Sequence, residues 1–349
     1  MAPYQQERSV AAHSDLYVRR RSTSTLATIV FLLFLAMTTG GCSQGTSPGV
    51  PLVDSGVTSA PATSAVQSPR IALVMKTLTN PFFAEMERGA RQAEAELGII
   101  LIVKTAAQET SIDQQIAIIE RLIVDHVAAI VVAPGDSTSL VPVLRRAQQA
   151  GIVIVNVDNR LDPTLAHELG LVGVPFISVD NVDGAYHAAS YLSHTITVPT
   201  EALILEGIPT AQNAIDRTTG ATKAFAENPK IAVVAVETAH WKIDEAFDVT
   251  KALLKAHPRV GAIFCANDMM ALGTIQYLAE AGRKDILVAG FDALPEARAA
   301  VKDGRMVATV DQQAARQGYL GVQYAAQMLA GTKLPAETMI PIALVTAAP

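Results

Sequence analysis

From residue 70 to its end, the chain alternates short apolar runs of four to six residues with longer stretches of helical periodicity. The apolar run at 71–75, for example, is followed at 81–97 by apolar residues that recur every three or four positions. Such alternation is typical of repeated βα units, which build a mostly parallel sheet with helices packed against it. The repeat therefore predicts an α/β protein, and 349 residues suffice for one large or two medium cores.

The predicted strands fall into two sets of similar size. Those of the first set lie at 71–75, 99–103, 129–132 and 152–157. Residues 159–175, which include two prolines, then read as a loop, and this is the natural place for one domain to lead into another. Those of the second set lie at 176–179, 202–205, 231–236, 262–265, 287–290, 307–310 and 340–345. The sequence therefore predicts two doubly wound, Rossmann-like domains, each with its own sheet.

The N-terminal residues lack this pattern. Three arginines at 19–21 precede an apolar run at 26–37, and small residues then lead to Cys42, which is the layout of an export signal over residues 1–42. An apolar core of about 12 residues falls short of the roughly 20 that span a bilayer, so a permanent transmembrane helix is the weaker interpretation. Residues 43–69 are rich in Ser, Thr, Pro and Ala and predict a flexible linker.

Composition and cysteine content exclude several functions. The chain is 17% charged with a net charge of −6, and no basic patch offers phosphates a binding surface, so nucleic acid is not an expected partner. The two cysteines are Cys42, in the targeting segment, and Cys265, inside an apolar run. We therefore expect no conventional internal disulfide and an inert core thiol at Cys265. No metal cluster, phosphate loop or nucleophile motif rises above chance, and no cofactor is predicted.

Polar and aromatic side chains gather where the predicted strands end. The residues concerned are Asn80, Phe82, Phe83, Asp158, Asn159, Asn267, Asp268, Asp292 and Gln312. In open α/β sheets the carboxyl ends of the strands face the ligand crevice. Carboxylates and amides hydrogen-bond to neighbouring hydroxyls, and aromatic rings pack on the C–H face of a sugar ring. Together these strand ends predict a sugar or polyol site between the two domains.

Each strand end also has a purely structural interpretation. Asn80 before a proline is a common helix start, and Asn267 and Asp268 are both preferred helix N-caps. Trp241, the only tryptophan, could be a partly buried surface ring. We expect Asn267 to reach the ligand and Asp268 to cap the helix that follows.

Three separated segments, at 71–83, 256–273 and 290–292, resemble the periplasmic ribose-binding protein family in their order and spacing. These are the sugar-binding proteins of ATP-driven importers, and they share a core with LacI-type repressors. The resemblance covers residue 70 to the C-terminus and implies the type I periplasmic binding protein fold, in which the chain crosses between domains near Val179, Gln312 and Ile340. The implied domains, joined by this three-segment hinge, are 70–179 with 313–340 and 180–312 with 341–349.

The resemblance also implies a ligand site. The implied ligand-binding residues are Lys76, Asn80, Phe82, Phe83, Asp158, Asn159, Arg217, Trp241, Asn267, Asp292 and Gln312. Lys76 replaces a small hydroxyl residue of the ribose binders, Asn159 an arginine and Trp241 a phenylalanine. Arg217 is the nearest partner for another arginine of the family, and a structural role for it stays open. These departures argue that the ligand is a monosaccharide or polyol other than ribose.

The end of the export signal resembles a bacterial lipoprotein box, which implies lipidation of Cys42 and anchoring of the chain to a membrane. Thr39 departs from the aliphatic residue usual in such boxes, so cleavage without lipidation stays open. The expected location is the periplasm or the outer face of the cytoplasmic membrane.

The resemblance implies a monomeric solute-binding protein that performs no chemistry and delivers its ligand to an ABC permease with its ATPase. An alternative is a sensory receptor that presents its closed form to a chemoreceptor or sensor kinase. A repressor core is disfavoured by the export signal and by the lack of an N-terminal helix-turn-helix. A glycoside hydrolase would need a pair of carboxyl groups such as Asp158 and Asp292, which alone is a weak signal.

Overall fold

The computed structural model describes residues 68–347, which lie within one compact unit, Ser64–Pro349. The predicted signal, Cys42 and nearly all of the predicted linker lie outside the described residues. Within the described part, two six-stranded sheets form, and we call each sheet with its helices a lobe. No helix between residues 68 and 347 is long and apolar enough to span a membrane.

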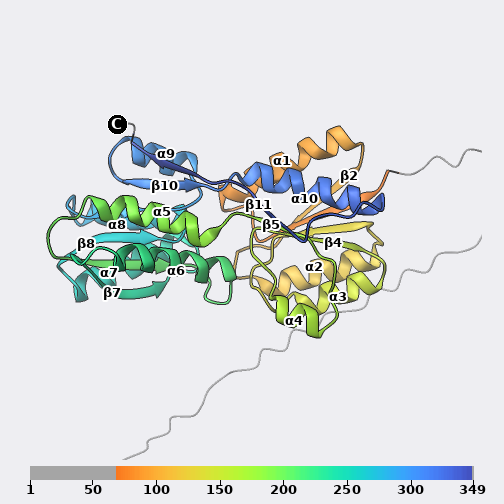
Figure 1. Cartoon of the computed structure of the whole chain (residues 1–349), viewed down its shortest axis with the longest axis horizontal. Helices are drawn as coiled ribbons and strands as arrows, with labels where there is room; N and C mark the ends of the chain where they lie inside the picture. Colours follow the sequence, from red (N-terminus) through yellow and green to blue (C-terminus); the bar gives the residue numbers. More distant parts are fainter. Residues whose placement is uncertain (1–67, 348–349) are drawn as a thin grey trace, which may run out of the picture. The chain divides into compact units, whose positions relative to one another are not determined.

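The first lobe is a parallel sheet with the strand order β11-β5-β4-β3-β1-β2. Its strands are β1 (Arg70–Met75), β2 (Ile100–Thr105), β3 (Ala129–Val132), β4 (Val153–Val157), β5 (Phe176–Ser178) and β11 (Glu337–Met339). Its helices are α1 (Pro81–Leu97), α2 (Ile112–Val124), α3 (Val141–Gln149), α4 (Pro163–Glu168) and α10 (Ala314–Leu329). Helices α1 and α10 cover one face of the sheet, and α2 and α3 cover the other (Figure 1).

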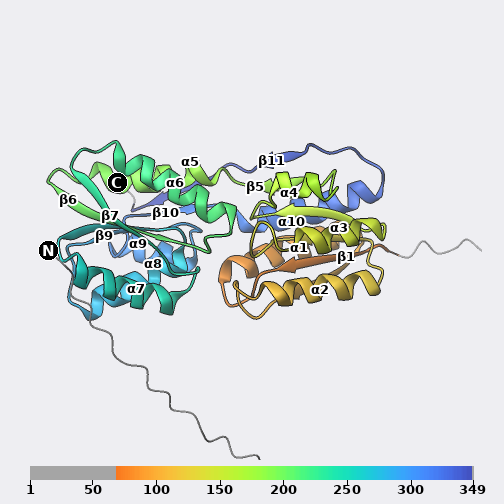
Figure 2. The ribbon, with the colours of Figure 1, turned by 90° about the horizontal axis from the view of Figure 1, so that it is seen from below.

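The second lobe has the strand order β12-β10-β9-β8-β6-β7, in which only β12 runs antiparallel to its neighbour. Its strands are β6 (Thr200–Glu206), β7 (Ile231–Thr238), β8 (Val260–Cys265), β9 (Leu287–Ala289), β10 (Ala308–Asp311) and β12 (Ala343–Thr346). Its helices are α5 (Asn181–His194), α6 (Gln212–Ala226), α7 (Ile243–Ala256), α8 (Asp268–Glu280) and α9 (Pro295–Lys302). Helices α5 and α6 lie on one face, and α7 and α8 on the other (Figure 2).

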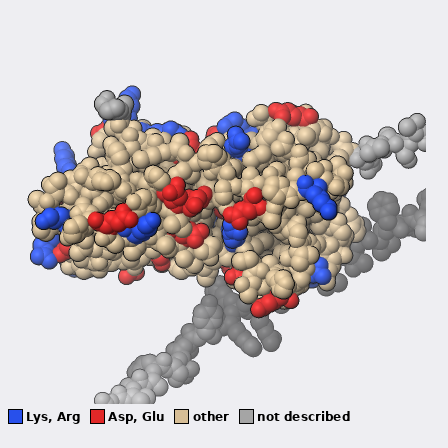
Figure 3. All heavy atoms as spheres, in the orientation of Figure 1, with Lys and Arg blue, Asp and Glu red and all other residues tan. Residues whose placement is uncertain are grey.

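These mostly parallel, helix-covered sheets confirm the predicted α/β fold with two doubly wound lobes. The chain passes from one sheet to the other after β5, after β10 and between β11 and β12. On the face drawn in Figure 3, lysine and arginine side chains are scattered among aspartate and glutamate.

Three local predictions need correction. The segment 159–175 is not all loop, because α4 forms there and the Asp162 carboxylate accepts from the Leu165 N–H at 2.6 Å. The sequence pattern predicts a helix from about residue 216, whereas α6 begins four residues earlier, at Gln212. The predicted last strand at 340–345 starts too early, because residues 340–342 cross between the lobes and Pro341 offers no N–H to a ladder, so β12 begins at Ala343. Strand β11, just before the crossing, is not predicted.

The strand, polar turn and helix predicted around residues 261–273 are confirmed as β8 and α8. The prediction that Asp268 caps α8 is wrong, because Asn267 is the N-cap and accepts from the Met270 N–H at 2.9 Å. The Asp268 carboxylate instead accepts from the Thr309 hydroxyl at 2.7 Å and from the Leu294 N–H at 2.9 Å. It thereby ties α8 to β10 and to the loop after β9, and burial raises its pKa to about 6.

Cys265, in the last position of β8, is the free cysteine of the described region. The side chain is fully buried, and this burial raises the pKa of its thiol to about 12. Since the thiolate is the reactive form, the structure agrees with an inert core residue.

Candidate functional site

The ends of strands from both lobes converge on one small cavity. Its lining residues are Lys76, Asn80, Phe82, Phe83, Glu109, Asp158, Asn213, Arg217, Trp241, Asn267, Asp292 and Gln312. Every predicted ligand-binding residue except Asn159 is therefore at this cavity, and Glu109 and Asn213 join them. The free volume inside the cavity is only about 20 Å³, far below the range of about 300–1,000 Å³ that is typical of ligand pockets, so the walls must move apart to admit a sugar ring.

The first lobe contributes a buried ion pair to the cavity. The Lys76 ammonium lies 2.9 Å from the Asp158 carboxylate, and the two side chains are only 2% and 3% exposed. The same ammonium lies 5.7 Å from the ring centroid of Phe83 and 5.9 Å from that of Trp241. Opposite charge and aromatic faces together compensate for the loss of water around the ammonium. Lys76 is thus an integral part of the cavity wall.

The second lobe contributes a second buried cation, Arg217, from the second turn of α6. The guanidinium lies 3.6 Å from the Asp292 carboxylate and 3.8 Å from the ring centroid of Phe291. It donates to Asn181 Oδ1 at 2.8 Å and to the carbonyl of Ala266 at 2.9 Å. Arg217 therefore both lines the cavity and holds several segments of the second lobe together.

The carboxyl group of Asp292 lies opposite this guanidinium. Burial raises the pKa of Asp292 well above its usual value, and the nearby Asp268 raises it further, while Arg217 opposes the shift. Gln312, at the crossing after β10, donates to Asp292 Oδ1 at 2.6 Å. The Asp292 backbone has a φ of 122°, which aims the side chain out of the regular strand direction.

Two of the asparagines combine a structural role with a place at the cavity. Asn80 caps α1 by accepting from the Phe82 N–H at 3.0 Å, and its amide nitrogen donates to Glu109 at 2.9 Å. Asn267 caps α8 in the same way and also lines the cavity. The capping interpretation and the site interpretation are therefore compatible, because the cap fixes the side chain at the cavity wall.

Glu109 and Asn213 are the cavity residues that sequence reasoning missed. Glu109 follows β2 just as the other polar residues follow their strands, but no aromatic or capping pattern marks it. It is buried, and this burial raises the pKa of its carboxyl group while Lys76 opposes the shift. Asn213 lies four residues before Arg217 on α6, and this spacing puts both on one helix face.

Trp241 forms a wall of the cavity and is only 3% exposed, so it is not a surface ring. A Cβ atom at Gly207 would lie 2.0 Å from its indole ring, so glycine leaves the room that the ring fills. Among the described residues, the indole N–H of Trp241 and Oδ1 of Asn213 are buried polar atoms without a protein partner. Both atoms are at the cavity and are suited to a ligand hydroxyl.

Asn159 does not line the cavity. Its side-chain nitrogen donates to the carbonyl of Pro134 at 3.2 Å, and its side-chain oxygen accepts from the Asn213 N–H at 3.2 Å. It thus contacts the second lobe beside the cavity, through the backbone of α6.

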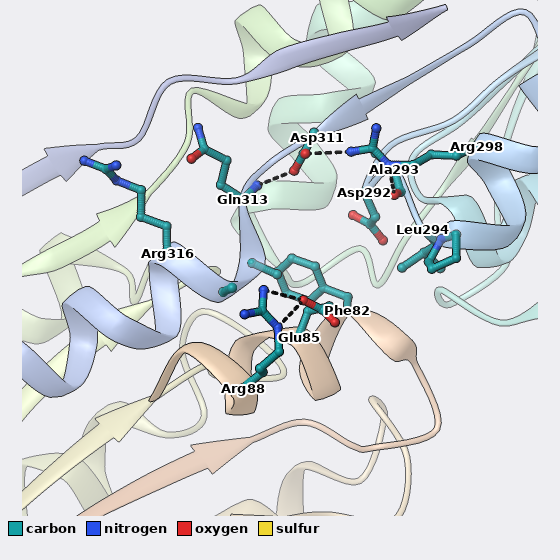
Figure 4. A pocket seen from close by; sticks show the side chains of 13 residues that line it. Phe82, Glu85, Arg88, Asp292, Ala293, Leu294, Arg298, Asp311, Gln313 and Arg316 are labelled. Atoms are coloured by element: carbon teal, nitrogen blue, oxygen red, sulfur yellow. Dashed lines mark hydrogen bonds and ion pairs between the residues drawn. The ribbon is translucent and has the colours of Figure 1, made fainter. Parts of the chain in front are cut away.

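A wider hollow of about 410 Å³ lies beside the cavity and shares Phe82 and Asp292 with it (Figure 4). Its walls come from α1, α10 and the segment from Asp292 to Arg298. Arg298 pairs with Asp311 at 2.6 Å on one side, and Arg88 pairs with Glu85 at 2.8 Å on the other. The hollow therefore joins the small cavity to charged side chains at the surface.

Comparisons with known proteins agree with this architecture. A family model described as a periplasmic binding protein domain matches residues 71–333. The chain is 41% identical over 268 residues to the D-ribose/D-allose-binding protein of Pseudomonas aeruginosa, covering 76% of this chain and 83% of that protein. It is 34% identical over 264 residues to the D-allose-binding periplasmic protein of Escherichia coli, covering 75% and 85%.

A solved structure gives the same result. The chain resembles an ABC transporter periplasmic solute-binding protein from Actinobacillus succinogenes with bound D-allose, at a TM-score of 0.76 and 37% identity, over 80% of this chain and 98% of that one. The chain belongs to the periplasmic binding protein family, as a sugar-binding protein of an ABC importer. The resemblance inferred from the sequence is confirmed, and the protein is a binding protein of the periplasm and not an enzyme.

Proposed function

We propose that this protein captures one molecule of D-allose, or of a closely related aldohexose, in the cavity between its lobes and delivers it to an ABC permease with its ATPase. The observation that carries the proposal is that cations, carboxylates, amides and aromatic rings from both lobes surround one small cavity. The names of the Pseudomonas aeruginosa and Escherichia coli relatives and the ligand of the Actinobacillus succinogenes structure support D-allose.

The chemistry of the cavity favours a hexose over ribose. A pyranose presents several neighbouring hydroxyls that both donate and accept, and a hexose has one more hydroxyl than a pentose. Lys76 can donate to hydroxyl oxygens, Glu109 can accept from hydroxyl hydrogens, and both line the cavity from the first lobe. The rings of Phe82, Phe83 and Trp241 offer apolar faces to the C–H face of the sugar.

Binding would involve closure of the lobes about the three crossings of the chain. We assign residues 70–179 with 313–340 to one moving domain and 180–312 with 341–349 to the other. Periplasmic binding proteins are an established example of hinge closure around a ligand. The wider hollow of Figure 4 would then be the remnant of the entrance, since it opens from Phe82 and Asp292 toward the surface.

Export and anchoring complete the proposal. Residues 1–42 would direct export, Cys42 would carry lipid, and residues 43–69 would tether a monomeric binding domain to the outer face of the cytoplasmic membrane. Stable anchoring needs more than one acyl chain, because one chain gives only marginal binding. Cleavage without lipid at Cys42, which Thr39 leaves open, would instead release the protein into the periplasm.

A thermal-shift screen of the exported chain tests the proposed ligand. A ligand that binds only the folded form raises the unfolding midpoint, by about 2.7 kcal/mol of stability at one hundred times its Kd. We expect D-allose to raise the midpoint more than D-ribose, and the rise to disappear in Asn267→Ala. The control Asp303→Asn removes an exposed carboxylate of the second lobe and should respond like the wild type. Absence of a shift with every monosaccharide and polyol in the screen would contradict the proposal.

A further inference from the structure

Helix α6 begins without a cap of its own. The first amides of any helix have no partner inside the helix, and a polar side chain at the N-cap usually accepts from one of them. The N-cap of α6 is Ala211, which has no side-chain acceptor. The acceptors come from the other lobe, because the Gln212 N–H donates to Ser137 Oγ at 2.9 Å and the Asn213 N–H donates to Asn159 Oδ1 at 3.2 Å.

Both acceptors are held in place within the first lobe. The Ser137 carbonyl accepts from the Asp162 N–H at 2.7 Å, and the Asn159 side chain donates to the carbonyl of Pro134 at 3.2 Å. Asn159 is fully buried, and Ser137 is 8% exposed. The acceptors are therefore oriented before α6 reaches them. A further hydrogen bond between the lobes, from the Ser137 N–H to the carbonyl of Thr210 at 3.0 Å, closes the contact.

We propose that Ser137 and Asn159 form a latch that caps α6 only when the lobes are closed, and that this latch sets how long the sugar stays bound although neither residue lines the cavity. Opening the lobes must separate these acceptors from α6 and leave its first amides to water. Closing them restores two hydrogen bonds at the positive end of a helix, away from water. The identity of the sugar in this inference rests on the proposed function, whereas the latch itself rests on the contacts between the lobes.

The latch also positions two residues of the cavity wall. Asn213 and Arg217 lie on one face of α6, and both line the cavity. The Asn213 amide nitrogen additionally lies 3.4 Å from the Asp158 carboxylate of the first lobe. Ser137 and Asn159 are thus positioning residues, which act on the ligand through the placement of α6.

The test measures D-allose binding and release in Ser137→Ala, Asn159→Ala and the double variant by stopped-flow fluorescence of Trp241. A helix cap contributes about 1 kcal/mol, which corresponds to about a fivefold change in an equilibrium constant. We expect each single variant to release the sugar about five times faster and the double variant about 10 to 30 times faster. The association rate should stay at the wild-type value, because the latch is open in the ligand-free protein. The unfolding midpoint without ligand should stay at the wild-type value in Ser137→Ala and should fall only in the variants that also lose the hydrogen bond from Asn159 to the carbonyl of Pro134.

Asp162→Ala is the matched control, since it removes a helix cap that lies within one lobe. We expect it to lower the midpoint of the ligand-free protein and to leave the release rate unchanged. Release from the double variant at the wild-type rate would overturn the latch, as would a double variant whose only defect is a lowered midpoint without ligand. Rescue of slow release by Ser137→Thr, which keeps the hydroxyl, would support it.

Hydrogen exchange gives a second measurement on the same proteins. In the wild type, the amides of Gln212 and Asn213 should exchange slowly with D-allose and faster without it, and in the double variant they should exchange fast in both. Equally slow exchange in the ligand-free wild type would mean a permanent contact and would overturn the latch.

If the wild type bound no sugar at all, the proposed function would fail. The latch would then be decided by small-angle scattering of the ligand-free proteins, in which a smaller radius of gyration for the wild type than for the double variant would show that the contact forms without sugar and would overturn it.

Discussion

Each lobe brings to the cavity one buried cation that faces a buried carboxylate, and these two pairs are built differently. Lys76 and Asp158 in the first lobe make a direct ion pair at 2.9 Å. Arg217 and Asp292 in the second lobe are 3.6 Å apart. The guanidinium also donates hydrogen bonds to Asn181 Oδ1 and to the carbonyl of Ala266. An ammonium is a compact charge that can turn toward a new acceptor, whereas a guanidinium has a fixed fork of five donors.

The two cations therefore have different roles. Arg217 has a fixed, structural role, because moving it would leave several buried acceptors without a donor. Lys76 depends mainly on Asp158 and on aromatic faces, so it is free to respond to the ligand. We therefore expect changes at Arg217 to act first on stability and changes at Lys76 to act first on affinity and on the choice of sugar.

The largest effect is expected for Arg217→Met. The substitution leaves Asn181 Oδ1 and the carbonyl of Ala266 buried without their donor and removes the cation that faces Asp292, and breaking a buried ion pair in this way costs about 3–5 kcal/mol. Urea unfolding of the ligand-free protein measures the loss. The control Arg298→Met removes a half-exposed ion pair and should change stability by no more than about 1 kcal/mol. A loss of stability in Arg217→Met as small as in Arg298→Met would contradict the structural role of Arg217.

Lys76→Met should produce the next largest effect, and mainly on binding. It deprives one carboxylate of its partner, so we expect a smaller stability loss, about 1–3 kcal/mol, than for Arg217→Met. The loss of a charged donor to the sugar should raise the Kd for D-allose about 10- to 100-fold. Calorimetric titration and urea unfolding on the same protein separate the two effects. If Lys76→Met kept the wild-type affinity and lost as much stability as Arg217→Met, the proposed difference between the roles of Lys76 and Arg217 would be wrong.

Gly207→Ala tests the role of Trp241, the aromatic ring that the second lobe contributes to the cavity wall. The new methyl group would meet the Trp241 ring at 2.0 Å, and overpacking of this kind typically costs about 1–3 kcal/mol. We expect weaker binding of D-allose and an altered fluorescence maximum of Trp241. Gly261→Ala is the control, because there the nearest atom is a side-chain methyl of Thr200 at 2.9 Å. Wild-type affinity in Gly207→Ala would show that the ring position is unimportant.

The smallest effect concerns pH and the acids of the second lobe. Burial raises the pKa of Asp268 to about 6, so the folded protein binds its proton more tightly than the unfolded chain does. The contribution of Asp268 to the free energy of unfolding is then fully present below pH 4 and is lost as the pH rises through about 6. Unfolding at pH 5 and pH 7 should differ by about 1 kcal/mol more in the wild type than in Asp268→Asn. An equal change in stability between pH 5 and pH 7 in the two proteins would argue against a raised pKa for Asp268.

Much of the fold and of the cavity could be predicted from the sequence, because the same residues that end a strand also begin a helix. Asn80 and Asn267 each follow an apolar run and each cap the next helix, so local pattern and site coincide. Strand β11 is missing from the sequence prediction and β12 begins three residues later than predicted, because no local feature tells which sheet a run of three or four residues will join. Their assignment depends on β5 and β10, which are distant in the chain.

The remainder of the site depends on contacts between distant segments. Glu109 lies in an ordinary polar stretch between β2 and α2, and its contact with Asn80, 29 positions earlier in the chain, forms only in the folded structure. The hydrogen bonds from α6 to Ser137 and Asn159 join residues 75 and 54 positions apart, and nothing in the sequence marks Ser137. Asn159 was predicted as a ligand contact from its place after β4, whereas its side chain faces the backbone of the other lobe.

The central claim is that the cavity between the lobes binds one monosaccharide. Calorimetric titration of the exported protein with D-allose tests it most directly. We predict one sugar per chain with a Kd of about 1 µM or below, equivalent to about −8 kcal/mol or stronger, and loss of the heat signal in Asn267→Ala. No binding heat with D-allose or any other monosaccharide, or the same affinity in Asn267→Ala as in the wild type, would contradict the account.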